Sequence, residues 1–362
     1  MVLFPPTYFF KLHDKLILTI VVSQLSMISF STAAEEELPD HLIELAWAYA
    51  ISTTPPPPLP PDGGEHSLPD TPLTFTRDQI LGRKDGVTFQ TAPADWYPGD
   101  HPEMPKIYSH GDPARKVIAC ALCHYPNGKG KAENAPPAGQ SKDYLVQQLL
   151  DFQNDLRKCA DPRKTNYELM TETAKGMTRE EIDEVSAYFA SMKWSPWIEV
   201  IETDTVPKTY LRGGLHIPME GDGAGTEPIG KRIIESPVDP YRTEFLRDPR
   251  SGFIAYVPKG SIEKGKALVR TGGGGKTLQC FICHGEDLNG IGTVPGIASR
   301  SPSYMARQMN DMKHGTRIGL MSALMKPVMA NLTSEDILNI VAYTASLPVK
   351  PPVPESSENT QN

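Results

Sequence analysis

Two stretches of five residues decide how this chain is organised: CALCH at 120–124 and CFICH at 280–284. Each matches Cys-x-x-Cys-His, the motif at which c-type haem is covalently attached. Two thiols three positions apart can add to the two vinyl groups of one porphyrin, and the imidazole that follows can bind the iron as its proximal ligand. The sequence therefore predicts two covalently bound haem c groups, each with its iron. The residues predicted to hold them are Cys120, Cys123 and His124 in the first motif and Cys280, Cys283 and His284 in the second.

Other uses of a Cys-x-x-Cys pair fit this chain less well. A structural zinc site needs two further ligands, and neither pair has a second Cys-x-x-Cys or a His-x₃₋₅-His close by in the sequence. A thioredoxin-like redox pair would lie in a β-α-β pattern, and no such pattern is visible. Covalent haem attachment is therefore the favoured interpretation of both motifs.

The composition narrows the class of protein. The 362 residues suffice for two or three domains, and the net charge of −8 argues against a nucleic-acid-binding surface. Only 5 cysteines are present, and four of them belong to the haem motifs, so a disulfide scaffold is excluded. The remaining one, Cys159, is predicted to be a small buried side chain; a sixth haem ligand or an intermolecular bridge are the alternatives.

The N-terminus has the features of a secretory signal peptide. Lys11 and Lys15 precede an apolar run at 16–28, and small residues at 31–34 offer a cleavage site. An uncleaved anchor helix is the alternative, but the run is short for a membrane span. We expect residues 1–34 to be removed and the mature chain to be periplasmic, associated with a membrane only through a partner.

The chain contains an internal repeat. The two haem motifs lie 160 positions apart, and Tyr144 and Tyr304 keep that offset, each opening an apolar-periodic segment typical of a helix. Further along, the offset becomes 155: Thr178 and Thr333 each have an acidic residue three positions on, the pattern of a capping box. The change of offset indicates an extra loop in the first copy, around Cys159.

The repeat predicts two helix-rich modules, and neither shows a convincing strand pattern. Such small modules bury little apolar surface by themselves, so a buried haem would complete each core. The expected division is 1–34 signal peptide, 35–104 irregular N-terminal extension, 105–195 first module, 196–256 inter-module linker, 257–350 second module and 351–362 disordered tail.

Methionines at equivalent positions of the repeat are candidates for the second axial ligand of each iron. Met170 and Met325 lie at the same distance before the capped helix of their module. A thioether opposite histidine raises the reduction potential and fills the last coordination site. Core packing is the alternative role, and Met321 and Met329 compete with Met325. Four other histidines are alternative axial ligands, but none of them has a histidine at the equivalent position of the other module. They are therefore expected to be ordinary surface or hydrogen-bonded side chains: His101, His110, His216 and His314.

Further segments resemble a known family. They are NAPPAGQ at 134–140, AYFAS at 187–191, PGIA at 295–298 and AYTASL at 342–347. Together with the haem motifs, they make the chain similar to dihaem c-type cytochromes built from two fused class I cytochrome c modules, most closely the cytochrome c4 type. The fold that this resemblance implies is mainly α, with long irregular Pro- and Gly-rich N-terminal and inter-module segments.

The resemblance also implies a role for one proline. In this family, a proline after the haem motif supplies a backbone carbonyl that orients the proximal histidine. Pro295 fits that role in the second module. In the first module the aligned position holds Ala135, and Pro136 follows one place late. In bacteria, covalent haem is attached outside the cytoplasm, which agrees with the signal peptide.

The expected function is electron transfer and not catalysis. Irons closed by histidine and methionine leave no position for a substrate, so reversible Fe(III)/Fe(II) cycling remains. The expected partners are an electron donor and an electron acceptor protein, including a membrane-bound respiratory complex, and no nucleic acid; the acidic surface favours basic docking patches on them. Two alternatives stay open: a haem subunit of a larger dehydrogenase or respiratory complex, and a dihaem enzyme of the peroxidase or thiosulfate dehydrogenase type.

Overall fold

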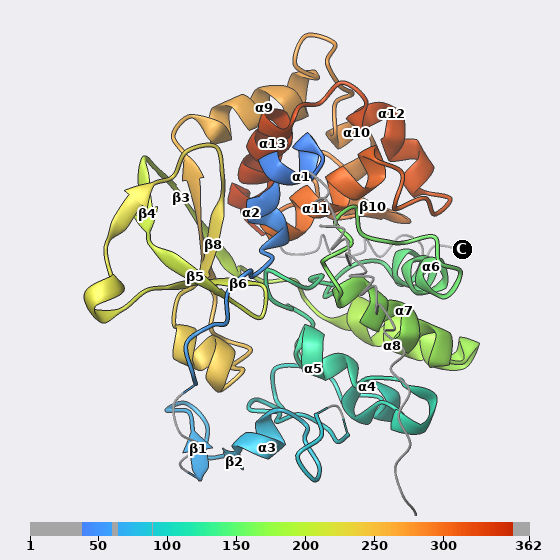
Figure 1. Cartoon of the computed structure of the whole chain (residues 1–362). Helices are drawn as coiled ribbons and strands as arrows, with labels where there is room; N and C mark the ends of the chain where they lie inside the picture. The colour runs from blue at the N-terminus through green and yellow to red at the C-terminus, as the bar shows by residue number, and fades with distance from the viewer. Residues whose placement is uncertain (1–37, 60–63, 89, 350–362) are drawn as a thin grey trace, which may run out of the picture. The chain divides into compact units, whose positions relative to one another are not determined.

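The computed structural model describes residues 38–59, 64–88 and 90–349 (Figure 1). The predicted signal peptide and the predicted C-terminal tail lie outside these ranges. Two sets of helices follow the two predicted modules, and a group of short strands lies between them in the sequence. None of the described helices is long and apolar enough to span a membrane.

The first set of helices surrounds the first haem motif. Helix α8 begins at a capping box in which Thr178 and Glu181 bond each other's backbone amides, as the sequence predicts. Its apolar face, with Ile182, Val185 and Phe189, packs into one core with residues of α4 and α6. The elements are α4 (Lys106–His110), η1 (Pro113–Arg115), α5 (Cys120–His124), α6 (Lys142–Gln153), α7 (Asn166–Gly176) and α8 (Arg179–Ser191).

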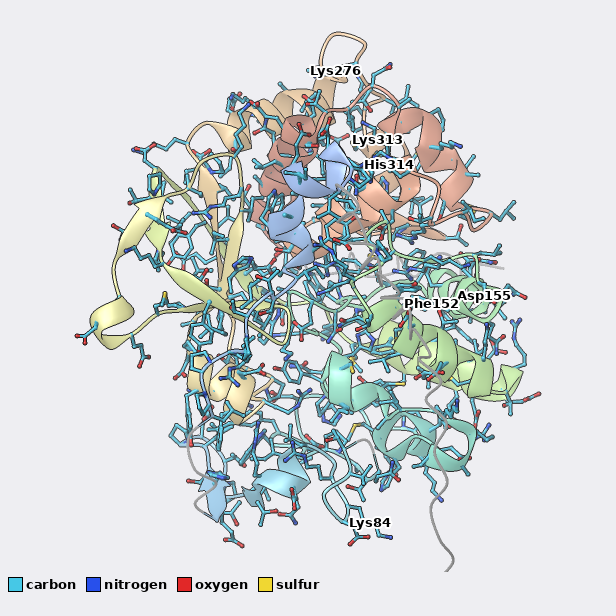
Figure 2. The ribbon with its side chains drawn as sticks, in the orientation of Figure 1. Lys84, Phe152, Asp155, Lys276, Lys313 and His314 are labelled. Carbon is cyan, nitrogen blue, oxygen red and sulfur yellow. The ribbon has the colours of Figure 1, made fainter. Side chains whose placement is uncertain are left out.

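The second set repeats this arrangement around the second haem motif. A capping box of Thr333 and Asp336 begins α13, and Lys276 forms an ion pair with Asp336 at 2.5 Å (Figure 2). Helices α9 and α13 cross so closely that a Cβ on Gly265 would lie 1.9 Å from the carbonyl oxygen of Asn339, so only glycine fits there. The elements are α9 (Ser261–Thr271), α10 (Phe281–His284), β10 (Gly290–Ile291), β11 (Val294–Pro295), α11 (Pro302–Lys313), η4 (Ser322–Leu324), α12 (Met325–Met329) and α13 (Ser334–Ser346).

The inter-module segment contains strands, so the prediction that it is irregular is wrong. Strand β9 lies between β3, which runs parallel to it, and β8, which runs antiparallel. Two further strand pairs, β4 with β7 and β5 with β6, are antiparallel. The elements are β3 (Ile198–Thr203), β4 (Thr205–Pro207), β5 (Thr209–Arg212), β6 (Leu215–Pro218), η2 (Gly221–Gly223), β7 (Thr226–Pro228), β8 (Ile234–Pro237), η3 (Tyr241–Phe245) and β9 (Phe253–Pro258).

The prolines of this segment explain the error. Five of its strands, β4, β6, β7, β8 and β9, have proline as their last residue. Proline has no backbone N–H to donate to a ladder, so it suits the end of a strand. The high proline content that suggested an irregular chain therefore marks where short strands stop.

The N-terminal extension is also partly ordered, which corrects the expectation of an irregular segment. Leu42 of α1, Leu45 between the two helices and Tyr49 of α2 are buried in the same core as residues of α13 and α11. The Tyr49 hydroxyl donates to Asp311 Oδ1 at 3.2 Å and accepts from Asn310 Nδ2 at 2.7 Å. The elements are α1 (Asp40–Glu44), α2 (Ala46–Tyr49), β1 (Glu65–Ser67), β2 (Thr74–Thr76) and α3 (Arg77–Ile80).

Candidate haem-binding site

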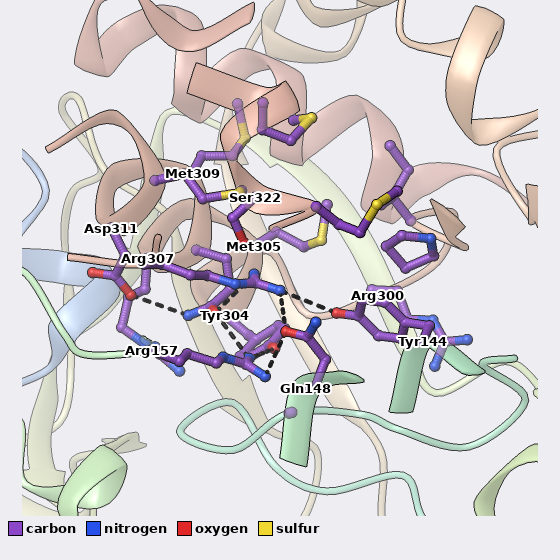
Figure 3. A pocket seen from close by; sticks show the side chains of 18 of the residues that line it. Tyr144, Gln148, Arg157, Arg300, Tyr304, Met305, Arg307, Met309, Asp311 and Ser322 are labelled. Carbon is purple, nitrogen blue, oxygen red and sulfur yellow. Dashed lines mark hydrogen bonds between the residues drawn. The ribbon is translucent and has the colours of Figure 1, made fainter. Parts of the chain in front are cut away.

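One cavity receives side chains from both modules. His124 and Met170 of the first module and His284 and Met325 of the second all line it. Its lining includes seven methionines and other apolar side chains, together with a group of hydrogen-bonded polar side chains that Figure 3 shows from close by. The four residues predicted to ligate iron therefore face one shared space, although they are spread over more than 200 positions of the sequence.

Both proximal histidines are held in the same way. The ring Nδ1 of His284 lies 2.7 Å from the carbonyl oxygen of Pro295, and Nδ1 of His124 lies 2.8 Å from that of Ala135. A carbonyl oxygen can only accept, so each Nδ1 carries the proton and donates it. Each Nε2 is then left with its lone pair free for a metal. A backbone carbonyl oxygen can accept this hydrogen bond whatever the side chain of its residue, so Ala135 can replace Pro295 in this role.

Burial keeps these imidazoles neutral. It lowers the pKa of His124 to about 4 and lowers the pKa of His284, in each case because the charged ring would lose its hydration. Metal ligation requires the neutral imidazole. Both histidines are therefore in the protonation state that an iron ligand needs.

The chain turns sharply after each haem motif. Tyr125 follows the first motif with φ 62° and ψ 159°, a conformation that is rare for any residue except glycine, and Gly285 occupies the same place after the second, with φ 85°. The Tyr108 hydroxyl donates to the Tyr125 carbonyl oxygen at 2.6 Å and holds this turn. The turn directs the following loop back over the histidine, where its carbonyl is needed.

The cavity lining does not decide which methionine is the second axial ligand of each iron, but it argues against the histidines that were the alternative ligands. Met321 and Met329 line it along with Met325, so the ligand sets His124/Met170 and His284/Met325 remain predictions. Among the described residues that line it, His101, His110, His216 and His314 do not appear. The ring of His314, which is labelled in Figure 2, instead stacks on that of His41, with ring centroids 3.6 Å apart. Cys159 lines the cavity and is partly buried against the core of the second module.

A polar network at the centre of the cavity repeats across the two modules. Arg157 donates to Tyr304 Oη at 2.6 Å, to Gln308 Oε1 at 3.0 Å and to Gln148 Oε1 at 3.1 Å (Figure 3). Each module thus supplies partners to the arginine of the other.

The partner arginine mirrors these contacts. Arg317 donates to Tyr144 Oη at 3.3 Å, to Gln148 Oε1 at 2.6 Å and to Gln308 Oε1 at 3.0 Å. The two arginines also pair through an antiparallel backbone bridge. Like the tyrosines and the glutamines, they lie 160 positions apart, so the extra loop of the first module must begin after Arg157.

The cavity lining holds more buried arginines than buried carboxylates, of which it has Glu133 and Asp311. Arg157, Arg300, Arg307 and Arg317 are all buried and line the cavity, yet in the part of the chain that the structure describes none of them forms an ion pair with a carboxylate. The Nε atoms of Arg300 and Arg317 have no hydrogen-bond partner. Burial lowers the pKa of Arg300 to about 9, because the charged guanidinium loses its hydration.

Buried cations of this kind require anions. The propionate carboxylates of bound haem would supply such anions to Arg157, Arg300, Arg307 and Arg317. The lining of the cavity therefore fits haem on two independent counts, the oriented histidines and the unpaired arginines. These arginines were not predicted from the sequence, although Arg157 and Arg317 share the 160-residue offset of the repeat.

These features define a c-type cytochrome: two attachment motifs, two oriented histidines and a shared cavity that calls for anions. The comparisons agree. A Cytochrome c family model matches residues 94–193. Cytochrome c4 of Pseudomonas aeruginosa is 25% identical over 240 residues, which cover 64% of this chain and 85% of that protein. Cytochrome c4 of Thiocapsa roseopersicina is 34% identical over 168 residues, covering 42% of this chain and 82% of that protein.

The chain belongs to the cytochrome c4 family, and the prediction of covalently bound haem c is confirmed. A further relative, from Stutzerimonas stutzeri, is named thiosulfate dehydrogenase electron acceptor; it is 22% identical over 245 residues, covering 67% of this chain and 85% of that protein. These relatives support electron transfer by haem as the function of the chain.

Proposed function

We propose that this chain is an exported electron carrier that moves electrons between a donor and an acceptor protein of the periplasm through two haems. The ligands of the irons are His124 with Met170 in the first module and His284 with Met325 in the second. Cys120 and Cys123 anchor the first haem, and Cys280 and Cys283 the second. Export follows from the signal-peptide features at 1–34.

One observation carries the proposal: the reciprocal arginine network between the modules. Arg157 and Arg317 each contact side chains of both modules inside one cavity. If their anionic partners are haem propionates, the same two arginines would bind both haems. Two redox centres held by shared residues would form a relay inside one chain.

The residues of the chain then have distinct tasks. Reversible one-electron cycling of iron is the chemistry that bound haem supplies. The carbonyls of Ala135 and Pro295 fix the rings of His124 and His284. The methionines close the remaining coordination site and raise the potential. The buried arginines would compensate the negative charge of the haem carboxylates.

The partners are proposed from the same chemistry. The relative named as an electron acceptor of thiosulfate dehydrogenase favours a carrier over an enzyme and suggests a dehydrogenase as donor. A haem subunit of a larger respiratory or dehydrogenase complex would use the same residues for the same step, and differs only in being permanently bound to its partner.

Spectropotentiometric titration of the purified holoprotein tests this function. We expect two reversible one-electron transitions and no steady-state consumption of hydrogen peroxide or thiosulfate when the chain is supplied alone with an artificial electron acceptor. Turnover of either compound by the isolated chain at a rate that one iron sustains would contradict the carrier and support a dihaem enzyme.

A further inference from the structure

A buried histidine lies against the helix that packs over the first haem motif. The side chain of His101 is only 4% exposed. Its ring packs edge-on against that of Tyr188 in α8, with centroids 6.4 Å apart. His101 is not among the described residues that line the haem cavity, and both of its ring nitrogens have partners within the chain. Its protonation state therefore follows from those partners.

Both ring nitrogens of His101 face atoms that accept a hydrogen bond. Nε2 lies 3.2 Å from Oδ1 of the Asp95 carboxylate, and Nδ1 lies 2.8 Å from the carbonyl oxygen of Pro102. Nδ1 also lies 3.0 Å from Tyr188 Oη, whose own proton is donated to the Pro126 carbonyl oxygen at 2.9 Å. A neutral imidazole would place a lone pair against one of these oxygens. The site therefore favours the doubly protonated, positively charged ring.

The charges around His101 act in the same direction. Burial lowers the pKa of His101, but the bonds to its acceptors and the negative charges of Asp95 and Asp100 outweigh this effect and raise the pKa above its ordinary value of 6.5. Arg250 of the inter-module segment bonds Asp100 at 2.7 Å and lowers its pKa, and the charge of Lys129 adds to this effect, so Asp100 stays ionised. His101 thus exchanges its proton with solvent near or above neutral pH.

Aromatic side chains fill the space between His101 and the first haem motif. The ring of Tyr188 lies 4.4 Å from that of Tyr108, and the ring of its neighbour Phe189 meets that of His124 edge-on, with centroids 5.7 Å apart. All three aromatic residues are buried, and burial raises the pKa of both tyrosines, so their hydroxyls stay neutral. A charge on His101 therefore acts on the first haem through a medium with little screening.

The second module has a permanent cation at the equivalent place. Tyr343 lies 155 positions after Tyr188, which is the offset of the two capped helices. Its hydroxyl accepts from Arg270 Nε at 3.3 Å. A guanidinium stays charged in proteins, whereas an imidazolium releases its proton at moderate pH. The repeat thus places a titratable cation, His101, beside the tyrosine of the first module and a fixed cation beside that of the second.

We propose that His101 binds a proton when the first haem is reduced and releases it when that haem is oxidised, whereas the fixed charge of Arg270 gives the second haem no such coupling. The electron comes from the donor protein and the proton from solvent, and the only bond that forms is the N–H bond of His101. The imidazolium favours the added electron, and the added electron strengthens proton binding by the same factor. This inference rests on the proposed carrier function and adds a proton-binding residue to it.

NMR titration of the wild-type holoprotein, with isotope-labelled histidine, tests the proposal without any substitution. We expect His101 to bind its proton about tenfold more tightly in the fully reduced chain than in the fully oxidised chain, which is the effect of one charge roughly 12 Å away at an effective dielectric constant of ~20. The resonances of His101 are those that His101→Gln lacks. Equal proton affinity in the two oxidation states would overturn the proposal.

Potentiometric titration from about pH 5 to about pH 9 gives an independent readout. One midpoint potential of the wild type should fall as the pH rises, by about 59 mV in total, which is the tenfold change converted for a one-electron step. His101→Gln should remove this transition and hold the affected potential near the value that the wild type has at high pH. Asp95→Asn removes the anion that favours the imidazolium, so it should move the transition to lower pH.

His314→Gln is the matched control, because His314 is a histidine of the second module that stacks on His41 outside the cavity lining. It should leave the transition as it is in the wild type. A transition that persists in His101→Gln, or that His314→Gln removes equally, would overturn the proposal. If His101→Gln does not fold, Asp95→Asn and the wild-type titrations still decide. Failure of the carrier function would differ from all of these, since the two potentials would then not titrate reversibly at any pH.

Discussion

Met325→Ala will abolish the weak far-red absorption band of one of the two ferric haems, and Met170→Ala will abolish that of the other. The band arises from sulfur on iron, and loss of the thioether also lowers the midpoint potential of the affected haem, by on the order of 0.1 V or more within the ~0.8 V range that axial ligands span. The double variant should show no far-red band and two low-potential haems. Optical titration of the three holoproteins provides both readouts.

Two other methionines of the same cavity supply the controls. Met329→Ala removes a buried side chain and should destabilise the fold by about 2–5 kcal/mol while keeping both far-red bands. Met321→Ala should likewise keep them. If Met321→Ala or Met329→Ala eliminates one band while Met325→Ala retains both, the ligand assignment of the second module is wrong. The equivalent places of Met170 and Met325 in the repeat are what favour them.

Arg157→Gln/Arg317→Gln will lower the midpoint potentials of both haems together. Positive charge near an iron favours its reduced form, and a full charge roughly 10 Å away is worth about 1.7 kcal/mol, or about 70 mV, at an effective dielectric constant of ~20. Both haems should shift because each arginine contacts side chains of both modules. Potentiometric titration of the variant and the wild type measures the shift.

Two control variants show whether a change of midpoint potential comes from the charge of the buried arginines or from their packing. Arg157→Lys/Arg317→Lys keeps the charge and should retain most of the potential, although lysine lacks the planar fork of donors. Arg179→Gln removes an exposed arginine, paired with Asp183 on α8, and should leave the potentials unchanged. A shift confined to one haem, or an equal shift in Arg179→Gln, would contradict a network shared by both haems.

The helices of the two modules could be predicted because their signals are local. The capping boxes at Thr178 and Thr333 lie within four consecutive residues, and the apolar spacing of α8 and α13 repeats over a few turns. The strands of the inter-module segment could not, since β3 pairs with β9 across about fifty residues and each strand is short. Long-range pairing leaves little trace in a single sequence.

The site was predictable to a similar degree and for similar reasons. Each haem motif predicts covalent haem attachment from five consecutive residues, and the repeat predicts Met170 and Met325 as axial ligands. The buried arginines escaped notice because charged side chains are normally expected at the surface. Ala135 stands where the second module has Pro295, and its carbonyl oxygen makes the same bond, because the contact is made by the backbone and not by the side chain.

Exposure of the fully reduced holoprotein to carbon monoxide tests the central claim most directly. The claim is that both irons are closed on two sides by His124 and Met170 and by His284 and Met325, so that only electrons pass. We predict no carbon monoxide adduct at either haem of the wild type on the timescale of mixing, and one adduct per chain in Met325→Ala. Rapid stoichiometric uptake by one haem of the wild type would show an open iron and contradict the account in favour of a dihaem enzyme.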